Sequence, residues 1–126
     1  MTWRIASAAL LALPLVALFA FVGWYKAFAS IPDLAAHHAW TVWLPESLGR
    51  LVGWSVMACA LALIGVVHSR TRPFAVVAAI VLVANQMVAA LFHVLHAEQA
   101  SLPQNAVLTA LALGVIFLSR TPRREM

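Results

Sequence analysis

Long apolar segments alternate with short polar stretches along the sequence. A helix that crosses a lipid bilayer needs about 20 mostly apolar residues. The segments that meet or approach this length are residues 5–25, 51–67, 74–95 and 104–119. The apolar run of the last one, Ala106 to Ser119, is short and spans only if Gln104 and Asn105 extend it, as in the bounds given, or if the bilayer thins locally. The pattern predicts an all-α fold, a transmembrane four-helix bundle that forms a single integral membrane domain over residues 1–126.

The third segment is unusual because its polar residues share one face. With about 100° per residue and Asn85 as the origin, His96 falls near ~20°, His93 near ~80° and Gln86 near ~100°. Most other residues on this face are small, whereas the remaining faces carry bulky apolar side chains. We therefore expect this helix to turn its polar face into the bundle and its other faces to lipid.

The connection from Ile31 to Ser47 is long for such a small protein. On a helix, one side of it would carry Leu34, His37, Trp40 and Leu44. This pattern predicts a short amphipathic segment on the outer surface of the bundle, which could cover the mouth of the bundle. The sequence does not show whether His37 and His38 face a pocket or solvent. As adjacent residues about 100° apart on a helix, they are a weak metal signal.

Composition and charge place the chain in a membrane. Hydrophobic residues make up 64% of the sequence and charged residues only 10%, and the first, second and fourth segments lack the polar outer face that a soluble bundle needs. Basic residues would gather on one side of the membrane, at Arg4, Arg70, Arg72, Arg120, Arg123 and Arg124. Both termini are therefore expected in the cytoplasm. Because these residues belong to three short segments, they indicate contact with lipid headgroups and not with nucleic acid.

Two further features bear on processing and redox chemistry. The first apolar run ends near Ala27-Phe28-Ala29, which looks like a signal-peptidase site, but the run exceeds the roughly 7–15 apolar residues of a signal peptide. We expect it to be retained as a helix. Cys59 is the only cysteine, so a thiol oxidase that relays electrons through cysteines paired within the chain is excluded.

The polar residues at the outer ends of the helices are the candidate site. The candidate ligand-binding residues are Lys26, Asn85, Gln86, His93 and His96. They could simply hydrogen-bond between helices and fix the packing. They could instead line a pocket for an amphipathic quinone, with His93 on a carbonyl oxygen. Haem ligation by His93 is less favoured because few partners lie near it. No metal site is expected, since zinc needs three or four converging ligands, and no catalytic residue can be assigned.

Several motifs in order resemble the DoxX-like family of small four-helix bacterial membrane proteins. They are Gly23-Trp24-Tyr25-Lys26, Trp43-Leu44-Pro45, Leu48-Gly49-Arg50 with Gly53, Phe92-His93 with Glu98, Asn105 with Leu108, and Arg120. The resemblance covers nearly the whole chain. One departure is Val56, where many relatives carry a glutamate, and chemistry that depends on that glutamate is in doubt here.

The resemblance implies a redox-linked role in the bacterial inner membrane. Some DoxX-type proteins are similar to a subunit of a thiosulfate:quinone oxidoreductase, and others associate with soluble redox enzymes. An accessory, quinone-associated subunit is therefore the favoured function, and the resemblance leaves open whether this chain is an enzyme. The alternatives are a non-enzymatic scaffold or assembly factor and a permeation pathway for a small solute. The sequence leaves open whether the chain forms a homo-oligomer.

Overall fold

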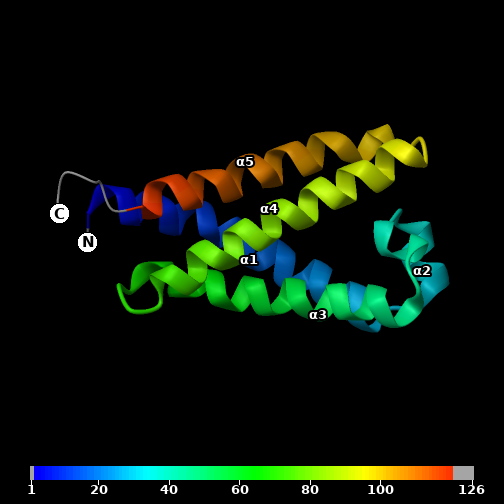
Figure 1. Ribbon diagram of the computed structural model, residues 1–126, viewed down its shortest axis with the longest axis horizontal. Helices are drawn as coiled ribbons and strands as arrows, with labels where there is room; N and C mark the ends of the chain where they lie inside the picture. The colour runs from blue at the N-terminus through cyan, green and yellow to red at the C-terminus, as the bar shows by residue number, and fades with distance from the viewer. Residues whose placement is uncertain (1, 121–126) are drawn as a thin grey trace.

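The computed structural model describes residues 2–120 and shows a bundle of long helices (Figure 1). Within these residues, four helical segments are long and apolar enough to cross a membrane: Trp3–Phe28, Glu46–Val67, Arg72–Leu95 and Gln99–Ser119. Large apolar side chains such as Leu13, Leu61 and Ile80 lie exposed on their outer faces, where only lipid makes exposure favourable. The predicted all-α transmembrane four-helix bundle is confirmed, and the protein is a multi-pass membrane protein.

Residues 2–120 form five α-helices and three short 3₁₀ helices. Their order is α1 (Trp3–Phe28), α2 (Ile31–Ala36), η1 (Trp40–Trp43), α3 (Glu46–Leu63), η2 (Ile64–Val67), α4 (Arg72–Leu95), η3 (Gln99–Ser101) and α5 (Leu102–Ser119). Each spanning segment begins before its predicted start, with polar residues such as Arg4, Glu46 and Arg72 in the first turn, and only α1 also extends at its end. Helix α3, for example, begins at Glu46 and not at residue 51, with the carboxylate in the first turn, where it favours the helix dipole.

The connection between α1 and α3 differs from the single amphipathic helix considered above. Helix α2 ends at Ala36 with His37 as its C-cap, and His38 has a left-handed backbone conformation (φ 57°) before η1 begins. The side chains of Leu34 and Trp40 are buried, whereas His37 is exposed. The segment therefore presents two separate anchors to the bundle and folds back across its end.

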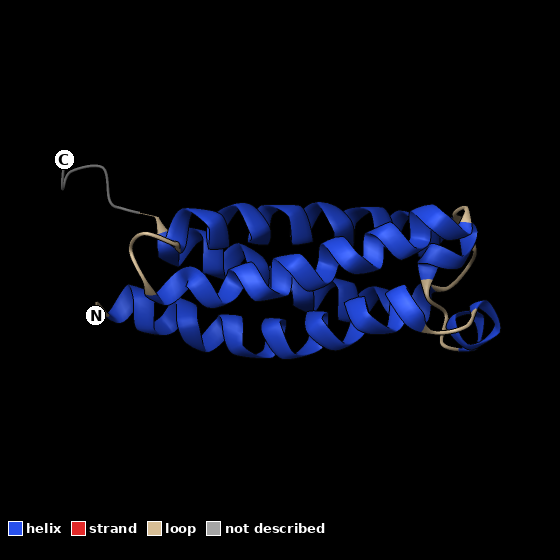
Figure 2. Cartoon of the chain, turned by 90° about the horizontal axis from the view of Figure 1, so that it is seen from below, coloured by secondary structure: helices blue, strands red, loops and turns tan. Residues whose placement is uncertain are grey.

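Both ends of the described chain lie at the same end of the bundle (Figures 1 and 2). Arg4 donates a hydrogen bond through Nη2 to the carbonyl oxygen of Phe117 over 2.7 Å, which joins the start of α1 to the end of α5. The turn that carries Arg70 and Arg72 lies at this end too. Arg123 and Arg124 of the expected cytoplasmic tail lie outside the described residues.

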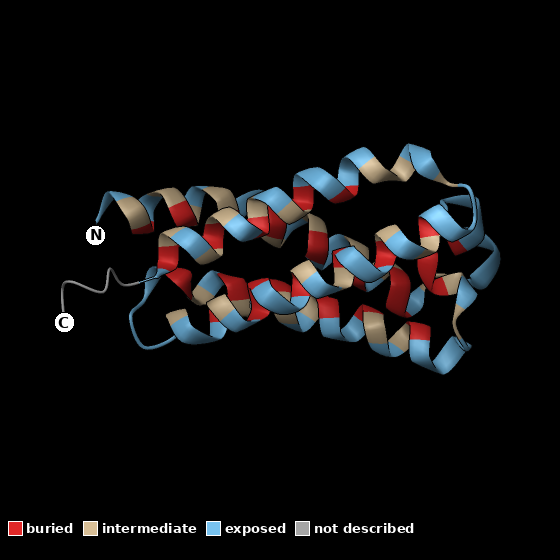
Figure 3. Cartoon of the chain, turned by 45° about the horizontal axis from the view of Figure 1, so that its top comes forward, coloured by how far each residue is buried: buried red, intermediate tan, exposed pale blue. Residues whose placement is uncertain are grey.

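Buried residues face inward along the whole bundle (Figure 3), and the hydrophobic core lies in the half nearer the termini. Its buried members, many of them alanine, are Ala8, Ala12, Leu15, Phe19, Val56, Ala60, Leu63, Val66, Ala75, Ala78, Ala79, Leu82, Leu108, Ala112 and Val115. Small residues allow close helix packing where lipid gives helices no hydrophobic reason to associate. The core ends at Phe19 and Leu108, and the other half of the bundle contains a cavity.

Candidate functional site

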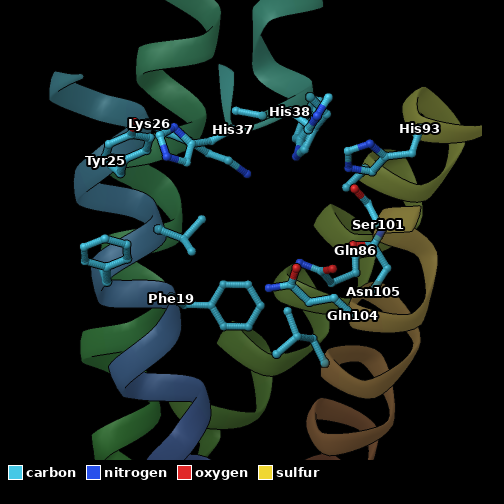
Figure 4. Close-up of a pocket in the computed structure, with 16 residues that line it drawn as sticks. Phe19, Tyr25, Lys26, His37, His38, Gln86, His93, Ser101, Gln104 and Asn105 are labelled. Carbon is cyan, nitrogen blue, oxygen red and sulfur yellow. Dashed lines mark hydrogen bonds between the residues drawn. The ribbon is translucent and has the colours of Figure 1, made fainter. Parts of the chain in front are cut away.

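A cavity of about 270 Å³ lies between α1, α4 and α5, beneath the segment formed by α2 and η1 (Figure 4). The apolar side chains of Phe19 and Leu108 form its floor. Lys26 enters from α1, and amide and imidazole side chains enter from α4 and α5. The site therefore combines an apolar base with a polar upper wall, which is a common design of small-molecule sites.

Helix α1 places Lys26 through a close contact with α3. A Cβ atom on Gly53 would lie 2.6 Å from the backbone N of Ala27 and 2.8 Å from the carbonyl oxygen of Gly23, so only glycine permits this crossing. On the same side, Arg50 Nη1 donates to the carbonyl oxygens of Lys26, over 3.0 Å, and of Ala29. The Lys26 backbone is thus held against α3, and its side chain points into the cavity (Figure 4).

The Lys26 ammonium group is buried without a carboxylate partner. The residue is 7% exposed, and no ion pair within the described residues includes it. Its Nζ atom lies 5.3 Å from the centre of the Trp40 ring, a favourable cation–π distance. A buried cation with so few partners favours a ligand that carries an electron-rich oxygen.

The opposite wall offers unpaired amide groups. Gln86 on α4 and Asn105 on α5 are 5% and 9% exposed. The Oε1 atom of Gln86 and the Nδ2 atom of Asn105 are buried and have no hydrogen-bond partner among the described residues. Because a buried polar atom normally has a partner, an acceptor and a donor remain available beside the cavity.

His93 connects the cavity to a carboxylate outside it. Its Nδ1 atom lies 3.2 Å from Glu98 Oε1, and Nδ1 of His38 lies 2.8 Å from Glu98 Oε2. A carboxylate only accepts hydrogen bonds, so both imidazoles donate from Nδ1, and Nε2 of His93 is left as the acceptor. The bond from His38, with the weaker one from His93, outweighs burial and holds the pKa of the Glu98 carboxyl below its usual range.

The sequence profile of the DoxX-like family matches residues 10–115, which is most of the chain. The chain belongs to the DoxX-like family. No curated protein and no solved structure matches it significantly. The family resemblance seen in the sequence motifs is therefore confirmed.

Three of the predicted ligand-binding residues of this DoxX-like chain meet at the cavity, namely Lys26, Gln86 and His93. Asn85 does not line it. This residue faces a separate groove between α3 and α4, and its Nδ2 atom is buried there without a partner. His96 caps the end of α4, where its ring stacks on Trp43 with centroids 3.7 Å apart. The helical wheel placed all four polar residues in one arc of the helix. In the structure, Gln86 and His93 face the cavity, whereas Asn85 and His96 contact other parts of the bundle.

The structure adds residues that were not among the predicted ligand-binding set. Beside the cavity these are Tyr25, His37, His38, Ser101, Gln104 and Asn105. Glu98 does not line the cavity, but its carboxylate accepts a hydrogen bond from Nδ1 of His93, which does. Both His37 and His38 reach the cavity lining while remaining partly open to solvent. No group of three or more histidine, cysteine, aspartate or glutamate side chains within residues 2–120 is arranged to hold a metal ion. The sequence feature that could have indicated these residues is the concentration of polar and charged side chains in the loops at this end of the bundle.

Proposed function

We propose that this DoxX-like protein is an accessory subunit of a redox system in the bacterial inner membrane and that its cavity binds a quinone headgroup. The proposal rests on one observation, namely that polar groups without partners lie on opposite walls of the cavity, above an apolar floor. A quinone carbonyl oxygen can accept from the Lys26 ammonium group or the Asn105 amide, and a hydroquinone hydroxyl can donate to Gln86 Oε1 or His93 Nε2.

The cavity has a volume that fits the headgroup of a quinone but not its isoprenoid tail. Ligand sites usually enclose roughly 300–1,000 Å³, and about 270 Å³ suffices for one or two fused rings. An isoprenoid tail would then lie among the apolar outer faces of the helices. The family relationship supports a redox setting through the resemblance noted above.

The orientation of the protein is part of the proposal. With the basic end that carries Arg4, Arg70 and Arg72 in the cytoplasm, the cavity opens toward the opposite side of the inner membrane. A quinone bound there would exchange protons with that side.

Substitutions in the cavity test quinone binding. The variants His93→Ala and Gln86→Leu each remove one polar partner, which corresponds to roughly a two- to tenfold loss of affinity for a quinone such as decylubiquinone. Lys26→Met removes a charged donor and should weaken binding by at least about tenfold. Asn85→Leu is the matched control because Asn85 neighbours Gln86 on α4 and lies outside the cavity. Affinity unchanged in all three cavity variants would reject the proposal.

A docking role is the second candidate, favoured by exposed small residues on α5. Ala106 and Ala110 line a shallow groove with Ala90 of α4, and a partner helix can approach closely over such residues. This function predicts a complex, with a second copy or with another membrane protein, that survives His93→Ala and is lost on Ala110→Leu. Gly114 cannot serve this test, because its added Cβ would meet Leu11 of the same chain. A solute pathway is less compatible with the packed core in the half nearer the termini.

A further inference from the structure

A continuous chain of side chains leads from the cavity to the surface. His93 lines the cavity with its side chain 6% exposed, Glu98 is 18% exposed, and His38 is 67% exposed. The two contacts along the chain measure 3.2 Å and 2.8 Å and use different oxygens of the same carboxylate. Exposure therefore rises at each step from the cavity to the solvent.

The backbone holds Glu98 over His93. Helix α4 ends in a Schellman motif, in which the N–H of Glu98 donates to the carbonyl of His93 over 2.7 Å and the N–H of Ala97 donates to Val94 over 3.2 Å. The motif requires a left-handed residue, and Ala97 supplies it with φ 58°. This position usually holds glycine.

The backbone places His38 by the same device. Helix α2 also ends in a Schellman motif, with the N–H of Ala39 donating to Leu34 over 2.9 Å and the N–H of His38 donating to Ala35 over 3.1 Å. His38 is the left-handed residue, with φ 57°. The contact between His38 and Glu98 therefore depends on two left-handed residues that are not glycine, His38 itself and Ala97, which precedes Glu98. Such conformations concentrate at functional sites.

We infer that His93, Glu98 and His38 form a proton path between a hydroxyl group bound in the cavity and the water on that side of the membrane. The inference rests on the proposed function, because the hydroxyl group is that of a hydroquinone or hydroxyquinone. Glu98 does not line the cavity and acts through His93, and His38 lies at the rim of the cavity with most of its side chain in solvent.

The step is an acid–base exchange that balances without an oxidant. The O–H bond of the ligand breaks, its electron pair stays on the oxygen beside the Lys26 ammonium group, and His93 Nε2 takes the proton. His93 releases its Nδ1 proton to Glu98. The exposed His38 ring turns so that its unprotonated Nε2 faces the carboxyl group and takes this proton, and Nδ1 of His38, which now faces solvent, releases its own proton to water. One proton leaves the ligand, one reaches water, and the charge on the three side chains is unchanged.

The other titratable groups at the cavity do not provide an equivalent path. Within residues 2–120, the Lys26 ammonium group donates no hydrogen bond that leads outward. Tyr25 contacts His37, whose Nδ1 lies 2.9 Å from the carbonyl oxygen of Asp33. A carbonyl oxygen only accepts, so this Nδ1 is occupied as a donor. Helix α5 contributes two amide groups and η3 one hydroxyl group to the cavity lining, and neither contributes a titratable side chain to it.

A pH jump on a bound indicator tests the path in the purified, detergent-solubilised protein. The probe is 5,8-dihydroxy-1,4-naphthoquinone, a quinone whose colour changes when a hydroxyl group loses its proton. We expect His38→Asn, which tolerates the left-handed conformation, and Glu98→Gln to slow the colour change of the bound probe at least about tenfold. In Glu98→Gln the probe affinity should stay within about twofold, because Glu98 does not line the cavity. In His38→Asn free imidazole in the buffer should restore the rate, since it can accept the proton from Glu98.

The control is His96→Asn, which removes an exposed histidine at the same end of the bundle and outside the cavity and should leave the rate unchanged. Wild-type rates in both path variants would overturn the proton path alone. A slow His38→Asn variant that imidazole does not rescue would also overturn it, because a purely structural role predicts that result. A wild-type protein that does not bind the probe would instead overturn the quinone site, and the path with it.

Discussion

Glu98 contacts His93 twice, through its backbone N–H to the His93 carbonyl at 2.7 Å and through its side chain to His93 Nδ1 at 3.2 Å. The first contact belongs to the end of helix α4, and the second orients the imidazole that lines the cavity. The geometry of a helix terminus therefore fixes which nitrogen of His93 faces a ligand. A change at this terminus should alter both the stability of the protein and the behaviour of the site.

The left-handed conformation of Ala97 gives a direct test of this terminus. An L-residue with a Cβ atom is less stable than glycine in this region by roughly 1–2 kcal/mol. We expect Ala97→Gly to raise the free energy of unfolding by about 1 kcal/mol, part of the gain being offset by the greater freedom of glycine in the unfolded chain. Thermal or denaturant unfolding in detergent measures it. Ala100→Gly in η3, where φ is negative, is the control and should be neutral or destabilising.

The Glu98 carboxylate should make stability depend on pH. Its pKa is lower in the folded protein than in the unfolded chain, chiefly because of the hydrogen bond from His38. The folded state therefore binds the proton less readily, and the contribution is present above the ordinary glutamate pKa and is lost as the pH falls through the folded value. Unfolding measured from neutral to acidic pH should show this loss in the wild type. Glu98→Gln should be less stable at neutral pH and should lose less on acidification, and an identical pH profile for both proteins would contradict the prediction.

The contact between Gly53 and α1 should tolerate no side chain. A Cβ atom there would meet backbone atoms, which cannot move aside as the end of a side chain can. We expect Gly53→Ala to destabilise the protein by roughly 1–3 kcal/mol and to weaken quinone binding by displacing Lys26. Ala58→Val on the exposed face of the same helix is the control. Wild-type stability in Gly53→Ala would show that α1 and α3 do not approach as closely as described.

Single cysteines test the orientation of the protein. In a Cys59→Ala background, Ser69→Cys marks the turn at the end that carries both termini, and Ala100→Cys marks the end nearer the cavity. If the basic end is cytoplasmic, a membrane-impermeant thiol reagent added to intact spheroplasts should label Ala100→Cys and spare Ser69→Cys. The opposite pattern would reverse the proposed topology and place the cavity on the cytoplasmic side.

Local periodicity in the sequence determined the helical framework. Apolar length alone predicted the four spans, and the wheel of α4 predicted that Gln86 and His93 would face the interior together. Lys26 was found from its position at the polar end of the first span. These features depend on residues near one another in the chain, so the sequence is sufficient for them.

Only the tertiary structure decided which residues share the cavity. Asn85 and His96 lie in the same arc of the helical wheel as Gln86 and His93. In the structure, however, Asn85 faces α3 and His96 stacks on Trp43 of η1. Glu98 and His38 meet across 60 residues of sequence because two helices end in left-handed residues that are not glycine, which removes the usual sequence signal. The contact depends on how the helices pack around one another, and no pattern along a single helix contains that information.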